Sequence, residues 1–482
     1  MTGERAVLRP DTATNTATPA AIAVPGTALP PRNQPDAIST TAVPPGAQPD
    51  AIPTTAPDPT TASPRLGARW SLAFAGVWLV VWTAQLTPTQ LLLPQQVRTG
   101  AEGSDWTSGV IVFGLIFSAV GLLALVAAPV IGRLSDRLPG RRRRPFLVGG
   151  VVLASAGLAI LGVQTTTAGV LAGWLAVSLG LVSASTAATA VVADQVPAAH
   201  RGVASGVIGA TQAVGLILGV ALCVLLALTV PGGYGLLAAL LLVVGLTGAL
   251  LLPDPPASSV TGIPLTRTAG GTARRGLLTA VARAGRDIVT RLRDQRPLRL
   301  ALTWTVLVNT GNALATGLLL FFLINGLGLD AAAADDQLLT VIAIYTVFVV
   351  IASFAGGWVS DRWGRRRPLV AAAAALQVVA AALIIVTPSI GGLDVAGALL
   401  GLSYGAFCSV NLALVVDALP DRTTVARDMS LLQIAQNGPQ TLAPVLGALV
   451  VAVTGGFTAL FAVAGLVSVL AVLVVARLRQ VR

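Results

Sequence analysis

Two short stretches of this chain are near-copies of each other, and both lie in polar gaps between long apolar runs. Box 1 begins Gly132-Arg-Leu-Ser-Asp-Arg137 and ends with four arginines and Pro145. Box 2 begins Gly357-Trp-Val-Ser-Asp-Arg362 and ends with three arginines and Pro368. Because the boxes lie about half a chain apart, they indicate two homologous halves whose apolar runs cross a membrane.

The composition excludes an ordinary soluble protein. Apolar residues make up 54% of the chain and charged residues 11%, and the mean hydropathy is +0.81. A soluble domain carries about 25% charged residues. The 482 residues could bury a sizeable core, but they include too few polar side chains to cover one. We therefore expect a polytopic membrane protein.

The sequence shows no pattern for catalysis, a metal or a cofactor. The single histidine, His200, lies in a polar gap without a cluster of cysteines or carboxylates around it. Cys223 and Cys408 lie inside apolar runs, where they are expected to pack as small apolar residues. Nucleophile elbows, metal-ligand spacings and phosphate-binding glycine loops are missing from the sequence. We expect no enzyme activity, no cofactor and no nucleic-acid partner.

The apolar runs predict the fold class. A bilayer core takes about 20 apolar residues as helix, and twelve runs of that kind follow Trp70. Residues 1–66 are rich in Pro, Thr and Ala and predict a disordered tail. The expected fold is an all-α polytopic membrane protein with twelve transmembrane helices in two pseudo-symmetric six-helix bundles. The bundles are 67–252 and 298–476, joined by a cytoplasmic central loop, 253–297, and followed by a short cytoplasmic tail, 477–482.

Charge predicts the orientation. Arginines concentrate in the central stretch and in the gaps after the second, fourth, eighth and tenth runs. The opposite gaps hold Arg98 beside acidic residues: Glu102, Asp105, Asp330, Asp335, Asp336 and Asp394. Arginine excess marks the cytoplasmic side of a membrane. We therefore expect a protein of the cell (inner or plasma) membrane with both termini and both boxes on the cytoplasmic side.

Six plus six spans, a central loop and the doubled box resemble the major facilitator superfamily over nearly everything after Trp70. A second repeated pair supports the resemblance: Asp194-Gln-Val-Pro is followed by Arg201, and Asp417-Ala-Leu-Pro by Arg427. The resemblance implies a transporter that works by alternating access. Its partners would be the lipid bilayer and a small solute, with a proton or another coupling ion left open, and a monomer is expected.

In the superfamily, the box is a latch that holds the two halves together on the cytoplasmic side. Its glycine allows close approach of two helices, and its aspartate is an acceptor at a helix end. The simpler alternative is that the arginines only set topology and anchor the loops on the inner leaflet. The resemblance implies gating roles for Gly132, Asp136, Arg137, Gly357, Asp361, Arg362, Asp194, Arg201, Asp417 and Arg427.

A narrower resemblance concerns the sucrose and glycoside–cation symporters. The end of box 1 with Pro145-Phe146 is similar to the box of those carriers. Within the first span, the segment Gln85-Leu-Thr-Pro-Thr-Gln90 is similar to one of their segments. This resemblance implies a sugar as the solute.

Solute in this fold binds near the midplane, lined mainly by spans 1, 4, 7 and 10 with help from 5 and 11. Polar side chains there are costly in hydrocarbon and therefore suggest function. Amides and hydroxyls suit a neutral polyol, although the Ser and Thr residues also suit ordinary helix packing. Span 11 also offers Gln440. The candidates are Gln85, Gln90, Asn309, Asn312, Tyr404, Asn411, Gln436 and Asn437.

We therefore expect a secondary active or facilitative transporter of a small, largely neutral solute. No acid lies at the centre of a predicted span, so the coupling stays open. The alternative is a proton-driven exporter of drugs or metabolites, whose usual Gly-Pro signature is missing from the fifth span. A non-transporting membrane sensor is a more distant alternative.

Overall fold

The computed structural model describes residues 67–100, 106–137, 143–196, 201–253, 295–363, 367–417 and 425–477. Within these ranges some side chains, mostly near helix ends, are also left undescribed. All of the described residues belong to one compact unit, Ser63–Arg482. The predicted N-terminal tail and most of the predicted central loop lie outside the described residues.

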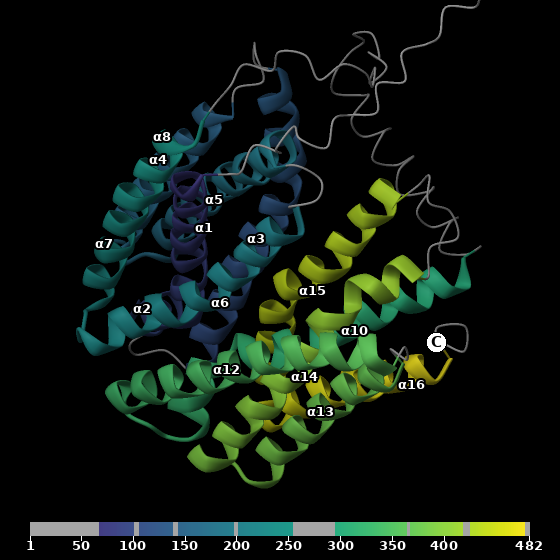
Figure 1. Ribbon diagram of the computed structural model, residues 1–482. Helices are drawn as coiled ribbons and strands as arrows, with labels where there is room; N and C mark the ends of the chain where they lie inside the picture. The colour runs from purple at the N-terminus through teal and green to yellow at the C-terminus, as the bar shows by residue number, and fades with distance from the viewer. Residues whose placement is uncertain are drawn as a thin grey trace, which may run out of the picture. The chain divides into compact units, whose positions relative to one another are not determined.

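The first six spans are helices, among them those labelled α1 to α8 in Figure 1. A π-helical turn interrupts two of them. The first span changes to a π-helical turn at Thr87-Pro88, a step that the sequence predicts to be irregular because of its proline. The elements are α1 (Ala68–Thr87), η1 (Pro88–Leu92), α2 (Leu93–Gly100), α3 (Trp106–Arg137), α4 (Arg144–Leu161), α5 (Thr167–Gln195), α6 (Arg201–Leu225), α7 (Val230–Leu240), η4 (Leu241–Gly245) and α8 (Leu246–Leu251).

The second half repeats this order of helices. Its first span is bent by 41° between α10 and α11, next to Leu318. The elements are α10 (Arg296–Gly317), α11 (Leu319–Phe321), η5 (Phe322–Gly326), α12 (Ala331–Trp363), α13 (Arg367–Val386), α14 (Ile390–Asp417), α15 (Val425–Thr454) and α16 (Thr458–Arg477).

By length and composition, 10 helices of the described residues can cross a membrane, or up to 11 if the bent pair α10–α11 is one span. The remaining long helix, α15, has 30 residues but is less apolar, with Pro439 and Pro444 inside it. The described residues contain no strand. The fold is therefore the predicted all-α membrane fold.

The same pairs of spans pack together in both halves, which gives the pseudo-symmetry a physical basis. In the first half, α1 packs on α6, α4 on α5, α3 on α5, and α4 on α7 and α8. In the second half, α10 packs on α15, α13 on α14, α12 on α14, and α13 on α16. If the six spans of each half are numbered from 1 to 6, both halves have the same packed pairs: spans 1 and 5, 3 and 4, 2 and 4, and 3 and 6.

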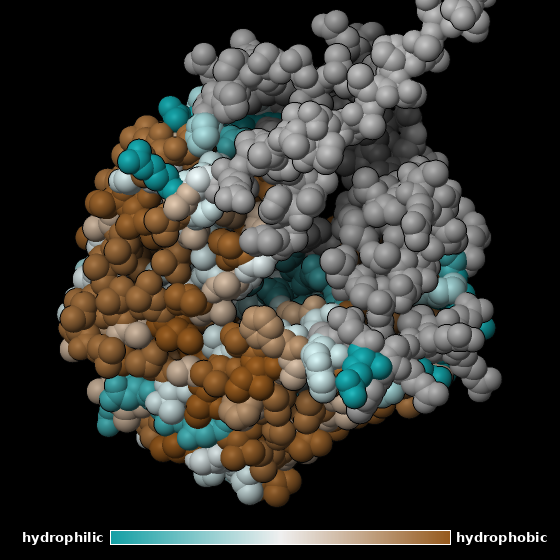
Figure 2. Space-filling model, in the orientation of Figure 1, coloured by the Kyte–Doolittle hydropathy of each residue, from teal (hydrophilic) through white to brown (hydrophobic). Residues whose placement is uncertain are grey.

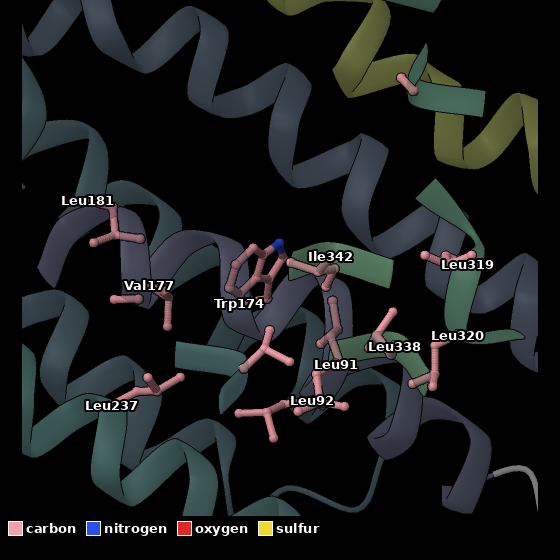
Figure 3. Close-up of a cluster of buried hydrophobic side chains, with 14 of the residues drawn as sticks. Leu91, Leu92, Trp174, Val177, Leu181, Leu237, Leu319, Leu320, Leu338 and Ile342 are labelled. Carbon is pink, nitrogen blue, oxygen red and sulfur yellow. The ribbon is translucent and has the colours of Figure 1, made fainter. Parts of the chain in front are cut away.

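The apolar interior forms two cores, a larger one that fills the first half and extends into the second, and a smaller one in the second half alone. We call the end that carries the boxes the box end and the opposite end the far end. The larger core includes far-end residues of both halves, such as Leu91 and Trp174 with Leu319, Leu338 and Ile342 (Figure 3). The smaller core contains second-half residues only and lies at the box end. The far end is therefore where apolar packing joins the two halves.

Candidate functional site

Four polar side chains from four different helices of the second half lie together. The hydroxyl of Tyr345 donates to Oδ1 of Asn312 at 3.4 Å, and Nε2 of Gln440 donates to the hydroxyl of Tyr404 at 3.4 Å. The rings of Tyr345 and Tyr404 are stacked, with centroids 6.3 Å apart. We call Asn312, Tyr345, Tyr404 and Gln440 the polar cluster. Both hydrogen bonds are long, so these groups can turn to a solute at small cost.

Exposure indicates which way the polar cluster faces. Gln440 is exposed, the two tyrosines are half-buried and Asn312 is buried. An amide left exposed to hydrocarbon would lack hydrogen-bond partners, so the exposed face of Gln440 must lie towards water. Figure 2 shows hydrophilic side chains gathered in a hollow of the visible face, with apolar surface to the left of it and below it.

The structure leaves four other candidates exposed or half-buried, in the first span and on α15. Gln85 is exposed on α1, and Gln90 is half-buried in η1. Gln436 is half-buried and Asn437 exposed on α15, one turn before Gln440. These amides can reach water as the polar cluster does, and their role as solute ligands stays a prediction.

Two candidates lie in the interior of the second half. Asn309 and Asn411 are each 1% exposed. The hydroxyl of Thr305 donates to Oδ1 of Asn411 at 2.7 Å, and Nδ2 of Asn309 donates to the carbonyl oxygen of Thr305 at 2.9 Å. This geometry ties α10 to α14, which favours a packing role for both amides.

Sequence reasoning did not select Tyr345. It lies on α12, in a span outside the set expected to line a site. A compositional signal was present, because the chain has only 3 tyrosines and two of them stack in the polar cluster. The third, Tyr234, is fully buried, and its hydroxyl has no hydrogen-bond partner in the structure.

The cysteines differ in exposure. Cys223 is buried, as the sequence predicts for a packing residue, whereas Cys408 is exposed. Cys408 lies one turn after Tyr404 on α14, and the two side chains interact. In the described residues, no three His, Cys, Asp or Glu side chains are grouped so that they could hold a metal ion.

Polar and aromatic contacts join the two halves at the far end. Nε2 of Gln95, on α2, donates to both carboxylate oxygens of Asp335, on α12, at 2.8 and 2.7 Å. The ring of Trp106 stacks on that of Phe457, with centroids 5.5 Å apart. These contacts must break if the far end is to open.

Helix α3 crosses α15 closely in the same region. The hydroxyl of Ser118 donates to the carbonyl oxygen of Thr441 at 2.7 Å. A methyl group added at Gly114 would lie 2.8 Å from the carbonyl oxygen of Pro444. Only glycine allows two backbones to approach in this way.

Most of the predicted latch residues have side chains outside the described residues. Two are described. A methyl group at Gly132 would lie 3.7 Å from Thr186, an ordinary contact, and the guanidinium of Arg362 lies 5.6 Å from the ring centroid of Trp358 on the same helix. The latch therefore stays a prediction. The predicted latch residues whose surroundings lie outside the described set are Asp136, Arg137, Asp361, Asp194, Arg201, Asp417, Arg427 and Gly357.

Comparison with protein families gives one match that covers most of the chain. The model of the Major Facilitator Superfamily matches residues 101–335 and 305–482. A curated relative, the Acurin A biosynthesis cluster MFS-type transporter of Aspergillus aculeatus, is 27% identical over 163 residues. That match covers 34% of this chain and 28% of the relative, so the chain matches less than a third of the relative's length.

Several solved transporters share the fold. The nucleoside transporter NupG superposes with a TM-score of 0.65 at 13% identity, covering 85% of this chain and 99% of that one. A bacterial homologue of the human lysosomal transporter Spinster gives 0.64 at 14% identity, covering 86% and 98%. A D-xylose–proton symporter gives 0.60 at 16% identity, covering 84% and 96%.

Proposed function

Since this chain belongs to the major facilitator superfamily and is a multi-pass membrane transporter, we propose that its solute is small, polar and uncharged. The polar cluster carries this proposal. Its two amides and two phenols offer donors and acceptors but no charge. The charged side chains of the described helices lie within about two turns of a helix end, far from the middle of the spans.

Within this class we propose a sugar. A sugar presents several hydroxyl groups at short spacing, and each can donate to or accept from an amide or a phenol. The similarity of Pro145-Phe146 and of the segment from Gln85 to Gln90 to sucrose and glycoside–cation symporters supports the same solute class. The solved symporter of D-xylose shows that the fold can serve a sugar.

We further propose that the box end is cytoplasmic, because the arginines lie there. In that orientation, the contacts of Gln95 with Asp335 and of Trp106 with Phe457 close the outer side. The solute would exchange with the cytoplasm in this state and with the outside once those contacts break. The transporter would act as a monomer in the cell membrane, with its coupling to a proton or another ion still to be measured.

Transport in proteoliposomes tests the proposal. We expect saturable uptake of a neutral mono- or disaccharide and none of the corresponding sugar phosphate, with pH and sodium gradients applied in turn to find the coupling. Efflux from preloaded vesicles separates import from export of drugs or metabolites. Uptake of a charged solute only, or of no saccharide at all, would contradict the proposal.

Single-residue variants connect transport to the polar cluster. Tyr404→Phe removes one hydroxyl from the cluster, and we expect KM to rise roughly 2- to 10-fold, as the loss of one hydrogen bond predicts. Tyr234→Phe is the matched control, because that hydroxyl is buried without a partner and its loss should leave KM unchanged. Equal effects of the two variants would remove the polar cluster from the binding site.

A further inference from the structure

The last arginine of each box reaches the end of another helix in its own half. In box 1, Nη2 of Arg144 donates to the carbonyl oxygens of Leu250 at 2.9 Å and Leu252 at 2.7 Å. In box 2, Nη2 of Arg367 donates to the carbonyl oxygen of Ala476 at 3.0 Å. The two arginines are equivalent in the repeat, since each comes directly before the proline that ends its box.

The acceptors are equivalent as well. Leu250 lies in the last turn of α8 and Leu252 is the C-cap of that helix, which ends the sixth span. Ala476 lies in the last turn of α16, which ends the twelfth span. The last four carbonyl groups of a helix have no partner within it and carry partial negative charge. A guanidinium is suited to them because it stays charged and donates several hydrogen bonds.

The first half adds further contacts at the same place. Nε2 of Gln195, at the end of α5, donates to the carbonyl oxygen of Pro253 at 2.6 Å. Oε1 of Gln195 accepts a hydrogen bond from Nε1 of Trp70 at 2.8 Å. Three carbonyl groups where the sixth span gives way to the central loop are therefore held by side chains of the third and fourth spans.

We propose that Arg144 and Arg367 are positioning residues that clamp the start of the third span to the end of the sixth span within each half. The clamp makes the start of the third span move together with the end of the sixth span. Each half then turns as one body during transport. The last arginine of each box would thus stabilise contacts within its own half, and this role is separate from a latch between the two halves.

The neighbouring arginines offer a matched control. Arg144→Gln and Arg142→Gln remove the same charge from the same run, and Arg367→Gln and Arg366→Gln do so in box 2. If the runs only set topology or contact lipid, the two members of each pair should behave alike. If the clamp exists, only Arg144→Gln and Arg367→Gln should have an effect at the helix ends.

Hydrogen exchange of the full chain in lipid nanodiscs measures this directly and needs no solute. We expect Arg144→Gln to speed exchange of the last turn of α8 roughly tenfold while α16 stays protected, and Arg367→Gln to do the reverse. Arg144→Lys should restore part of the protection, because an ammonium group can reach one carbonyl group. The exchange rates are measured on folded protein in nanodiscs, so a variant that folds in lower yield would not by itself show faster exchange at one helix end.

Distances and kinetics complete the test. Spin labels at the box ends of α4 and α8 should give a broader distance distribution in Arg144→Gln than in Arg142→Gln. Once a solute is known, Arg144→Gln should lower the maximal rate roughly threefold and leave KM unchanged. Unchanged exchange and distances in Arg144→Gln and Arg367→Gln would overturn the clamp whether or not a neutral solute is transported.

Discussion

The two helices that carry the boxes occupy equivalent places in the repeat but have different main partners. Helix α3 has 32 residues and α12 has 33. The most extensive packing of α3 is on α15 in the other half, whereas α12 packs most extensively on α14 in its own half. The equivalent contact between the halves, of α12 with α6, is less extensive than that of α3 with α15, so the two seams between the halves differ.

Glycines explain the difference. On α3, a methyl group at Gly121 would lie 2.6 Å from Cγ2 of Thr441 on α15, and Gly114 is equally close to that helix. In the second half the glycines are on α14, where Gly401 and Gly405 face the carbonyl oxygens of Tyr345 and Val349 on α12. Close backbone approach thus fixes α12 within its half and fixes α3 to the opposite half. We infer that α3–α15 is the seam that must rearrange during transport, and α12–α14 a permanent one.

Gly405→Val should have the largest effect, because it attacks the permanent seam. The new side chain would meet backbone of Val349, which cannot move aside as a flexible side chain can. Overpacking typically costs about 1–3 kcal/mol and more against backbone, so we expect Tm to fall by at least roughly 5 °C. Thermal unfolding in detergent measures it. The control is Gly391→Val on the same helix, where nothing lies within 4 Å; equal losses would refute the packing argument.

Gly114→Val should have an intermediate effect of a different kind. It pushes α3 away from α15 at the carbonyl group of Pro444, so we expect the protein to fold but to open at the far end. Spin labels at the exposed Ser108 and Thr458 should show a longer distance, and transport should slow roughly tenfold. If Tm falls as far as in Gly405→Val while the distance stays the same, α3–α15 is a permanent seam too.

Asp335→Asn should have the smallest effect. It weakens the contact of α12 with Gln95 without changing the packing of either helix. Hydrogen bonds to a charged group are worth about 1.5–3 kcal/mol, and the variant should lose part of that. We expect the ratio of molecules with an open far end to molecules with a closed one to rise roughly fivefold, as measured by the distance between labels at Ser108 and Thr458. Asp336→Asn, next to it and exposed, is the control and should leave the distribution unchanged.

The sequence predicted the fold well because its signals are repeated. Two boxes and long apolar runs require two halves in a membrane, and the all-α fold with its family is confirmed. That α3 packs most extensively on the opposite half, and α12 within its own half, could not be predicted. A glycine in the sequence shows that close approach is allowed but not which helix will approach, because that depends on the crossing of helices far apart in the chain.

The site was predicted in part. Polar side chains in an apolar span are costly enough to attract notice, which is how the amide Asn312 and the phenol Tyr404 were selected. Asn309 and Asn411 carry the same signal, but the structure places them inside the second half, since composition cannot distinguish the face of a helix turned to its neighbour from the face turned to water. The clamp was not foreseen either, because a run of arginines gives no indication that its last member differs from the rest.

Cys408 gives this protein a natural attachment point, because its side chain is exposed while that of Cys223 is buried. A polar maleimide should therefore modify Cys408 before Cys223 in the unaltered chain, and slowly, because neighbouring protein atoms crowd the Cys408 thiol. That position adjoins Tyr404, where bound solute would shield it from the reagent. The rate of alkylation therefore becomes an occupancy assay that needs neither radiolabelled compounds nor engineered cysteines, and a screen of candidate solutes can begin with the native protein.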